Sequence, residues 1–193
     1  EYFLIRALSC QDQVLNLFAE REQAQTEIKK DYQRTERLIE KCGDLFNQIS
    51  YLETFHYMQN MLLRDVDMMS MAHPVEVRVP FMDHRLVEMM FRIPGKEKGV
   101  AKSLLVSSMK SLLPESVQRR KKMGFTFPFE LWMRGALRPE IEPVLLSKTE
   151  QLDGLVSQKA VEEVWNDFLA RKISWSRPWA LYVLKSWLNK NLS

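Results

Sequence analysis

Charged side chains stand at three places in this sequence where apolar or turn-forming residues surround them. Arg64 lies in a long apolar run, Glu76 and Arg78 alternate with valines, and the four basic residues 119–122 come just before Gly124. A fixed cation beside a glycine-containing turn can hold phosphate oxygens, and a guanidinium among apolar residues needs an acidic or phosphate partner. These residues are therefore the candidates for an anion-binding site.

The basic run 119–122 has three interpretations. It is a solvated charged turn, a nucleic-acid or nuclear-import patch, or a phosphate site in which a lysine reaches a nucleotide or pyrophosphate. The second interpretation lacks interleaved aromatic residues, and the net charge of the chain is only +3. The run is held between a short helical segment and the turn 124–128, which favours a positioned cation.

Glu76 and Arg78 are expected to interact, because an unpaired charge buried among apolar residues is strongly unfavourable. They form an ion pair that is hydrogen-bonded to nearby backbone, or they contact a ligand. Asp83 precedes a helical apolar pattern over residues 84–92 and is expected to cap that helix. The three histidines are isolated in the sequence, so we predict no metal site.

The candidate site residues lie in or next to segments with helical periodicity. Apolar residues recur at steps of three and four along most of the chain, and the one short run with strand-like alternation is 75–79. Between Gly43 and Pro74 the pattern is apolar nearly all round, which predicts a helix buried at the centre of its domain. The fold class predicted is all-α, a multi-helix domain. Further helices are expected over residues 20–42, 84–92, 101–113, 136–146, 157–170 and 177–190.

The composition is that of an ordinary globular protein, with 46% hydrophobic and 27% charged residues. The 193 residues fit one domain, and no apolar run approaches the roughly 20 residues that a membrane span needs. Cys10 and Cys42 have no metal-binding or redox spacing, which indicates reduced thiols and a cytoplasmic location. We expect neither nucleic acid nor membrane as a partner.

Two motifs resemble those of a known family. Residues 69–83 contain Ser-Met-Ala-His, then Glu-x-Arg, then Pro-Phe-Met-Asp, and this order resembles the first signature of the synthetase domain of glutamine-hydrolysing asparagine synthetases. Downstream, Leu-Pro-Glu-Ser-Val at 113–117, the basic run and Gly124-Phe125 with Pro128 resemble the second signature of that family. The resemblance covers essentially the whole chain.

The resemblance implies that residues 1–193 are the C-terminal helical portion of an adenine-nucleotide-α-hydrolase-like synthetase domain. The full enzyme would hydrolyse glutamine in an N-terminal domain, use ATP with Mg²⁺ to adenylate aspartate or a related carboxylate, and let ammonia displace AMP. The chain begins at Glu1 without an initiator methionine, and it contains neither the Ser-Gly-Gly-x-Asp-Ser phosphate loop nor the nucleophilic cysteine. The fragment itself is therefore expected to be inactive and to bind no cofactor, and its partners would be the nucleotide-binding half and the glutaminase domain of the same chain, with small-molecule substrates.

The site residues that the resemblance implies are carried over position by position. Lys122 matches the catalytic lysine near the pyrophosphate, while Lys121 and Arg64 would bind ATP, pyrophosphate or substrate. In several members of the family an acidic residue precedes the position of Arg64 by about one turn, whereas this chain has Asn-Met-Leu at 60–62. The residues expected to frame the site are Glu76, Arg78 and Asp83.

Two other functions fit the residues. The chain could be a non-catalytic helical binding module whose basic turn holds a phosphate-bearing partner, or a degenerate synthetase-like domain kept for oligomerisation. If the face that packs on the nucleotide half is uncovered, we expect it to pair with a second copy of the chain.

Overall fold

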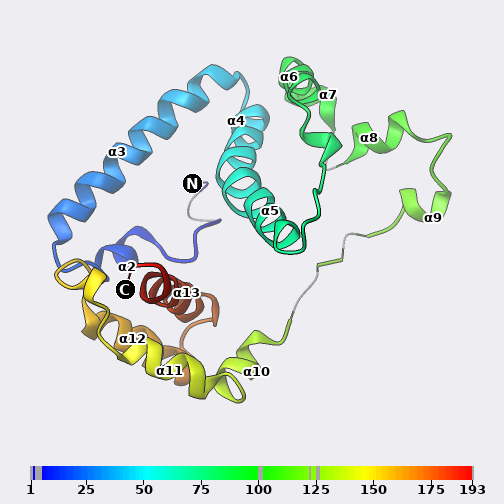
Figure 1. Cartoon of the computed structure of the whole chain (residues 1–193). Helices are drawn as coiled ribbons and strands as arrows, with labels where there is room; N and C mark the ends of the chain where they lie inside the picture. Colours follow the sequence, from blue (N-terminus) through cyan, green and yellow to red (C-terminus); the bar gives the residue numbers. More distant parts are fainter. Residues whose placement is uncertain (1, 3–5, 100–101, 122, 125–126, 193) are drawn as a thin grey trace. The chain divides into compact units, whose positions relative to one another are not determined.

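The structure is a computed structural model that describes residues 2, 6–99, 102–121, 123–124 and 127–192. Its regular elements are helices, and within these residues no strand occurs beyond an isolated antiparallel bridge between Phe18 and Val156. The predicted all-α class is therefore confirmed. The α-helices are α2 (Gln11–Leu15), α3 (Arg21–Ile39), α4 (Leu45–Leu52), α5 (Arg64–Met71), α6 (His84–Arg92), α7 (Gly95–Lys98), α8 (Ser103–Ser108), α9 (Glu115–Gln118), α10 (Phe129–Arg134), α11 (Arg138–Leu146), α12 (Gln158–Leu169) and α13 (Ser176–Asn191) (Figure 1).

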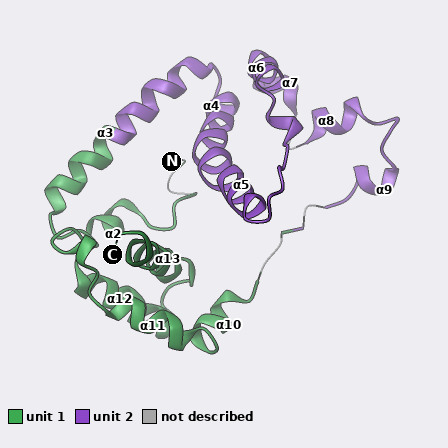
Figure 2. Cartoon of the chain, in the orientation of Figure 1, with its two compact units in different colours: residues 1–30, 124–193 green, residues 31–123 purple. Residues whose placement is uncertain are grey.

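The chain divides into two compact units (Figure 2). Unit 1 consists of residues 1–30 and 124–193, and unit 2 consists of residues 31–123. The two segments of unit 1 are tied by backbone hydrogen bonds, because Ala19 donates to the Leu155 carbonyl (2.9 Å) and Ser157 donates to the Leu17 carbonyl (2.7 Å). That residues 1–193 form a single domain stays a prediction.

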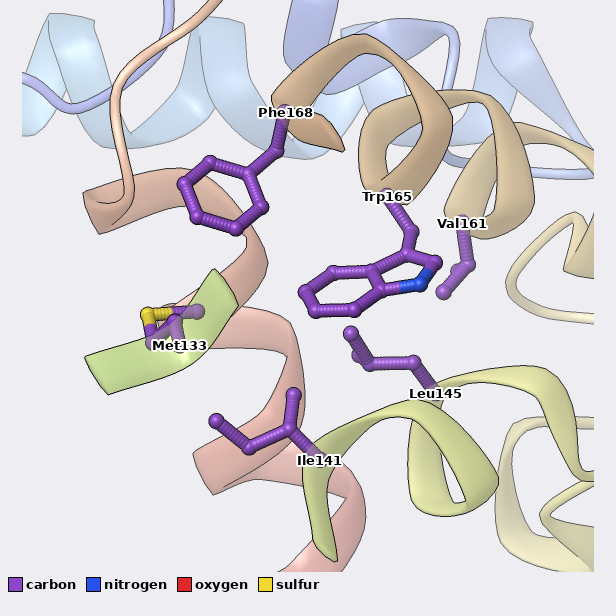
Figure 3. Close-up of a cluster of buried hydrophobic side chains, with 6 residues drawn as sticks. All are labelled: Met133, Ile141, Leu145, Val161, Trp165 and Phe168. Carbon is purple, nitrogen blue, oxygen red and sulfur yellow. The ribbon is translucent and has the colours of Figure 1, made fainter. Parts of the chain in front are cut away.

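Unit 1 has an apolar core in which α10, α11 and α12 meet (Figure 3). The most buried side chains are the aromatic pair Trp165 and Phe168, at 1% and 0% exposure, with their ring centroids 5.4 Å apart. The indole Nε1 of Trp165 donates to Glu142 (3.0 Å), so the one polar atom of this buried ring is satisfied. The remaining members of the core are Met133, Ile141, Leu145 and Val161.

A buried lysine joins α13 to the end of α11. Lys185 is 1% exposed, and its ammonium donates to the carbonyls of Leu145 (2.8 Å) and Ser147 (2.5 Å) and to Gln158 Oε1 (3.1 Å). The last carbonyls of a helix lack partners within the helix and carry partial negative charge, so a cation there is favourable. Burial lowers the pKa of Lys185, an effect that the nearby Glu162 partly opposes. All three N–H groups of this ammonium are used, so Lys185 is a structural cap.

Unit 2 is built around one long helix that runs from α4 through a π-helix, η2 (Glu53–Leu63), into α5. Its N-terminal end is fastened to α7, because Asp44 accepts from the backbone N–H of Gly95 (2.7 Å) and Asn47 bonds the buried ammonium of Lys98. That ammonium also lies 5.4 Å from the ring centroid of Phe46. These contacts lie at one end of the long helix.

The expectation that the helix between Gly43 and Pro74 is buried is wrong. Leu52 is 5% exposed, but Met61, Met68 and Met69 are 52%, 67% and 73% exposed. The physical reason is that α4 packs on α7, whereas α5 mainly contacts the π-helix that precedes it. An apolar pattern shows which residues need cover but does not supply the element that covers them.

Candidate functional site

The first signature, residues 69–83, leaves the long helix through a turn centred on Ser70. The carbonyl of Ser70 accepts from the backbone N–H of both His73 (2.9 Å) and Val75 (3.0 Å), which ends α5. Residues 75–79 then form neither helix nor strand and lead to the 3₁₀-helix η3 (Pro80–Met82). The two signature carboxylates, at positions 76 and 83, therefore lie on either side of η3.

Glu76 and Arg78 form an ion pair at the surface. The Nε of Arg78 donates to Glu76 Oε1 at 3.0 Å, and the two side chains are 71% and 84% exposed for Glu76 and Arg78 respectively. Their expected burial is wrong, because the neighbouring Val75 and Val77 are themselves 52% and 50% exposed. An exposed pair contributes only about 0–1 kcal/mol, so it can shape this segment but barely stabilises the fold. Its role as a frame for a binding site stays a prediction.

Asp83 caps α6 as expected. Its carboxylate accepts from the backbone N–H of Arg85 (2.9 Å) and also bonds the Arg85 guanidinium, with Nη2 to Oδ2 at 2.9 Å. The guanidinium and, to a smaller extent, the backbone N–H lower the pKa of Asp83 from 3.8 to about 2. The start of α6 is thus fixed by a residue of the first signature.

We expect the stabilising effect of the Asp83 cap to be complete above pH 3.8 and to be lost as the pH falls through about 2, because the folded state lowers the pKa of this carboxyl group. NMR titration of the Asp83 side-chain carboxyl checks this. An Arg85→Ala variant should titrate closer to 3.8, because it lacks the guanidinium. A midpoint near 3.8 in the unmodified protein would contradict the contacts described above.

Arg64 is the first residue of α5 and is exposed. Among the residues that the structure describes, no carboxylate forms an ion pair with its guanidinium, although Asp65 and Asp67 lie in the same helical turn. A permanently charged fork without a protein partner is available to bind a carboxylate or phosphate of a ligand. The binding role of Arg64 stays a prediction.

The second basic candidate lies past α9. Lys121 is exposed, and Lys122 lies outside the described residues. The Gln118 amide holds this segment by donating to the Leu113 carbonyl (2.6 Å), and Arg119 pairs with Glu115 (2.6 Å). Arg64 begins α5 and Lys121 follows α9 in the same unit, and their convergence on one ligand stays a prediction.

The sequence did not predict that Lys98 and Lys185 are buried. Neither lysine is free to bind a ligand. Lys98 and Lys185 are 6% and 1% exposed, and each is engaged by protein acceptors. A cavity of about 200 Å³ in unit 1 borders Lys185, Thr149, Gln158 and Val161, but it contains none of the signature residues. The signal for Lys185 was its position in an apolar stripe, between Leu181 and Leu188 at helical spacing.

Two further findings concern metal binding and membrane insertion. Across the described ranges, no three histidine, cysteine or acidic side chains gather closely enough to hold a metal ion. In the same residues, every helix falls short of the length and apolar character needed to cross a membrane.

Comparison with known families adds to this geometry: the asparagine synthase model matches residues 6–189. The chain therefore belongs to the asparagine synthase family.

Individual relatives cover parts of the chain. It is 28% identical over 150 residues to asparagine synthetase [glutamine-hydrolyzing] 1 of Bacillus subtilis, which is 76% of this chain and 23% of that protein. It is 41% identical over 81 residues to asparagine synthetase [glutamine-hydrolyzing] 3 of the same organism, covering 40% of this chain and 13% of that protein. Amidase chry2 of Gibberella zeae is 27% identical over 126 residues, which is 60% of this chain and 18% of the amidase.

The chain thus spans about a quarter of the length of the first of these relatives and less of the other two. No solved structure matches the chain.

Proposed function

We propose that this chain is the C-terminal helical part of the synthetase domain in an asparagine synthetase-like, ATP-dependent amidotransferase of the cytoplasm. The observation that carries the proposal is the family match over residues 6–189, which includes both signatures in their proper order. The relatives named above as glutamine-hydrolysing asparagine synthetases support the same reaction class.

The reaction has two steps. A carboxylate oxygen of aspartate, or of a related acid, attacks the α-phosphorus of ATP, and the bond to pyrophosphate breaks. Ammonia derived from glutamine then attacks the acyl carbon, AMP leaves, and an amide remains. Both steps place negative charge on a leaving group, so fixed cations near the phosphates accelerate them.

The exposed cations of this chain fit that demand. Arg64 has no ion-pair partner among the described residues, and Lys121 is exposed, so both can meet phosphate or carboxylate oxygens. Lys122 would stabilise the departing pyrophosphate, while the Glu76–Arg78 pair and the Asp83 cap would hold the segment that frames the site. Mg²⁺ would bind mainly to the ATP phosphates, with one or two carboxylates and water completing its coordination.

The test measures AMP and amide together. The full-length protein, given ATP, Mg²⁺, ammonia and aspartate or another carboxylate, is expected to form one AMP per amide. The isolated residues 1–193 are expected to form no AMP, because the sequence lacks the phosphate loop of the family. AMP formation by the isolated chain would refute its assignment as an incomplete site. Failure of the full-length protein to amidate any of a panel of carboxylates would refute the proposed reaction.

A further inference from the structure

The π-helix η2 is the most unusual local feature of unit 2. It runs for 11 residues, Glu53–Leu63, whereas π-helical hydrogen bonding is generally limited to single turns inserted in α-helices, frequently at functional sites. Both flanking residues have α-helical dihedral angles, with φ −61° and ψ −42° at Leu52 and φ −63° and ψ −45° at Arg64. The chain thus enters and leaves the segment as an α-helix, in the continuous helical ribbon between α4 and α5 (Figure 1).

The sequence of this segment suits α-helical winding as well. Its apolar residues continue the spacing of three, four or seven that runs through Leu52, Phe55, Leu62 and Val66, and it contains neither glycine nor proline. Local residue preferences therefore do not impose the wider winding. The choice between the two windings depends on contacts made by the segment.

Aromatic contacts hold the first turn of the π-helix. Tyr51 stacks on Phe55, with centroids 6.1 Å apart and planes at 6°, and meets the edge of Phe91 of α6 at 6.5 Å. Phe55 in turn lies edge-to-face against His56 at 5.0 Å. The C-terminal part of the segment differs, because residues 59–62 are exposed. The π-helix is therefore anchored at its start and free to set the direction of α5.

The first residue of α5 is Arg64, directly after the π-helix. A π-helix has about 4.4 residues per turn against 3.6 in an α-helix, so each residue turns the chain by roughly 80° rather than 100°. Over 11 residues the two windings differ by about 200°, which is about half a turn. The winding of Glu53–Leu63 thus decides whether α5 presents Arg64 on one side of the long helix or on nearly the opposite side.

We propose that the π winding of Glu53–Leu63 is the substrate-competent state, in which this segment positions Arg64 toward the anionic substrate. The inference rests on the proposed function in one respect, the binding role of Arg64. The segment itself touches no substrate and acts only through the direction it gives to α5.

A pair of histidines tests the winding. Positions 54 and 59 both lie in the π-helix, five residues apart, and point about 50° from each other in π winding but about 140° in α winding. A Thr54→His/Gln59→His variant of the full-length protein should therefore chelate Ni²⁺ and melt at a temperature higher by about 5 °C when Ni²⁺ is added. The matched control is Gln59→His alone, which should show no such rise. An equal change in melting temperature on Ni²⁺ addition in the two variants would overturn the π winding.

The same variant tests the substrate-competent state. With Ni²⁺ bound, the KM for ATP of the double variant is expected to stay within about twofold of that of the Ni²⁺-treated Gln59→His control, because the metal fixes the winding that positions Arg64. A KM that rises on Ni²⁺ binding only in the double variant would overturn the proposal. The melting test needs no enzyme activity, so it reads the winding even if the proposed reaction fails.

An insertion that rotates α5 but replaces no side chain tests whether the direction of α5 matters. Inserting one alanine after Gln59 turns α5 by roughly 80° in π winding and should raise the KM for ATP at least about tenfold, with a smaller change in kcat. Unchanged KM values for both ATP and the carboxylate substrate in a folded insertion variant would show that the direction of α5 has no bearing on substrate binding. If the insertion variant does not fold, the Ni²⁺ measurements alone decide.

Discussion

Replacing Lys122 by alanine is expected to lower amide synthesis by the full-length protein about 10²–10³-fold, the usual cost of removing one group that stabilises developing negative charge. In the proposed reaction this lysine would stabilise the departing pyrophosphate, whose charge grows as the carboxylate attacks the α-phosphorus. Its position in the second signature, two residues before Gly124, carries the assignment. The measurement is pyrophosphate release per enzyme under saturating substrates.

Two controls separate chemistry from folding in the Lys122→Ala experiment. Glutamine hydrolysis in the same preparation should be unchanged, because in the proposed enzyme it would take place in another domain. The neighbouring variant Lys121→Ala removes an exposed cation that is assigned to binding, so it should raise the KM for ATP and, under saturating substrates, lower synthesis far less. Equal loss of both activities would assign Lys122 to the fold, and a larger loss in Lys121→Ala would move the catalytic role to that residue.

Trp165→Ala is expected to destabilise unit 1 by about 3–5 kcal/mol, the typical cost of removing a large buried aromatic side chain. The indole is 1% exposed, packs on Phe168, and donates a hydrogen bond to Glu142, so its loss leaves a cavity and an acceptor short of one donor. Urea denaturation followed by circular dichroism measures the free energy of unfolding.

The matched control is Trp187→Ala on α13 of the same unit. The side chain of Trp187 is 55% exposed, so its truncation should change the stability by no more than about 0.5 kcal/mol. A similar loss in both variants would contradict the core drawn in Figure 3.

The helices of the C-terminal half could be predicted closely because their signals are local. The apolar spacing over residues 157–170 and 177–190 predicted α12 and α13, which the structure places at Gln158–Leu169 and Ser176–Asn191. Ser157 caps α12 by accepting from the Ala160 N–H (3.3 Å). Caps and periodicity involve residues a few positions apart, so the sequence alone contains them.

Burial and winding could not be predicted in the same way, because both depend on neighbours distant in sequence. The long helix was expected to be buried since it is apolar nearly all round, yet Met68 and Met69 are exposed. Nothing in the spacing of its residues distinguishes the π-helix from an α-helix, and the contact of Tyr51 with Phe91 joins residues that lie on different helices.

The candidate site shows the same division. The capping by Asp83 was expected, and the pairing of Glu76 with Arg78 was one of two expectations, because each partner lies two residues away. That the side chains at 76 and 78 are exposed depends on tertiary surroundings and was missed. Lys185 was missed for a related reason: a lysine is ordinarily at the surface, and only the carbonyls at the end of α11 make its burial favourable.

Unit 1 is formed by two separate segments of the chain, which constrains the order in which the units can fold during synthesis. Residues 31–123, which make up unit 2, are all synthesised before any of residues 124–193, and units of this kind can fold as they emerge. Residues 1–30 must wait, because the backbone partners of Leu17 and Ala19 are Ser157 and Leu155. Residues 1–30 are therefore translated before unit 2 but complete their packing only after unit 2 has had time to fold.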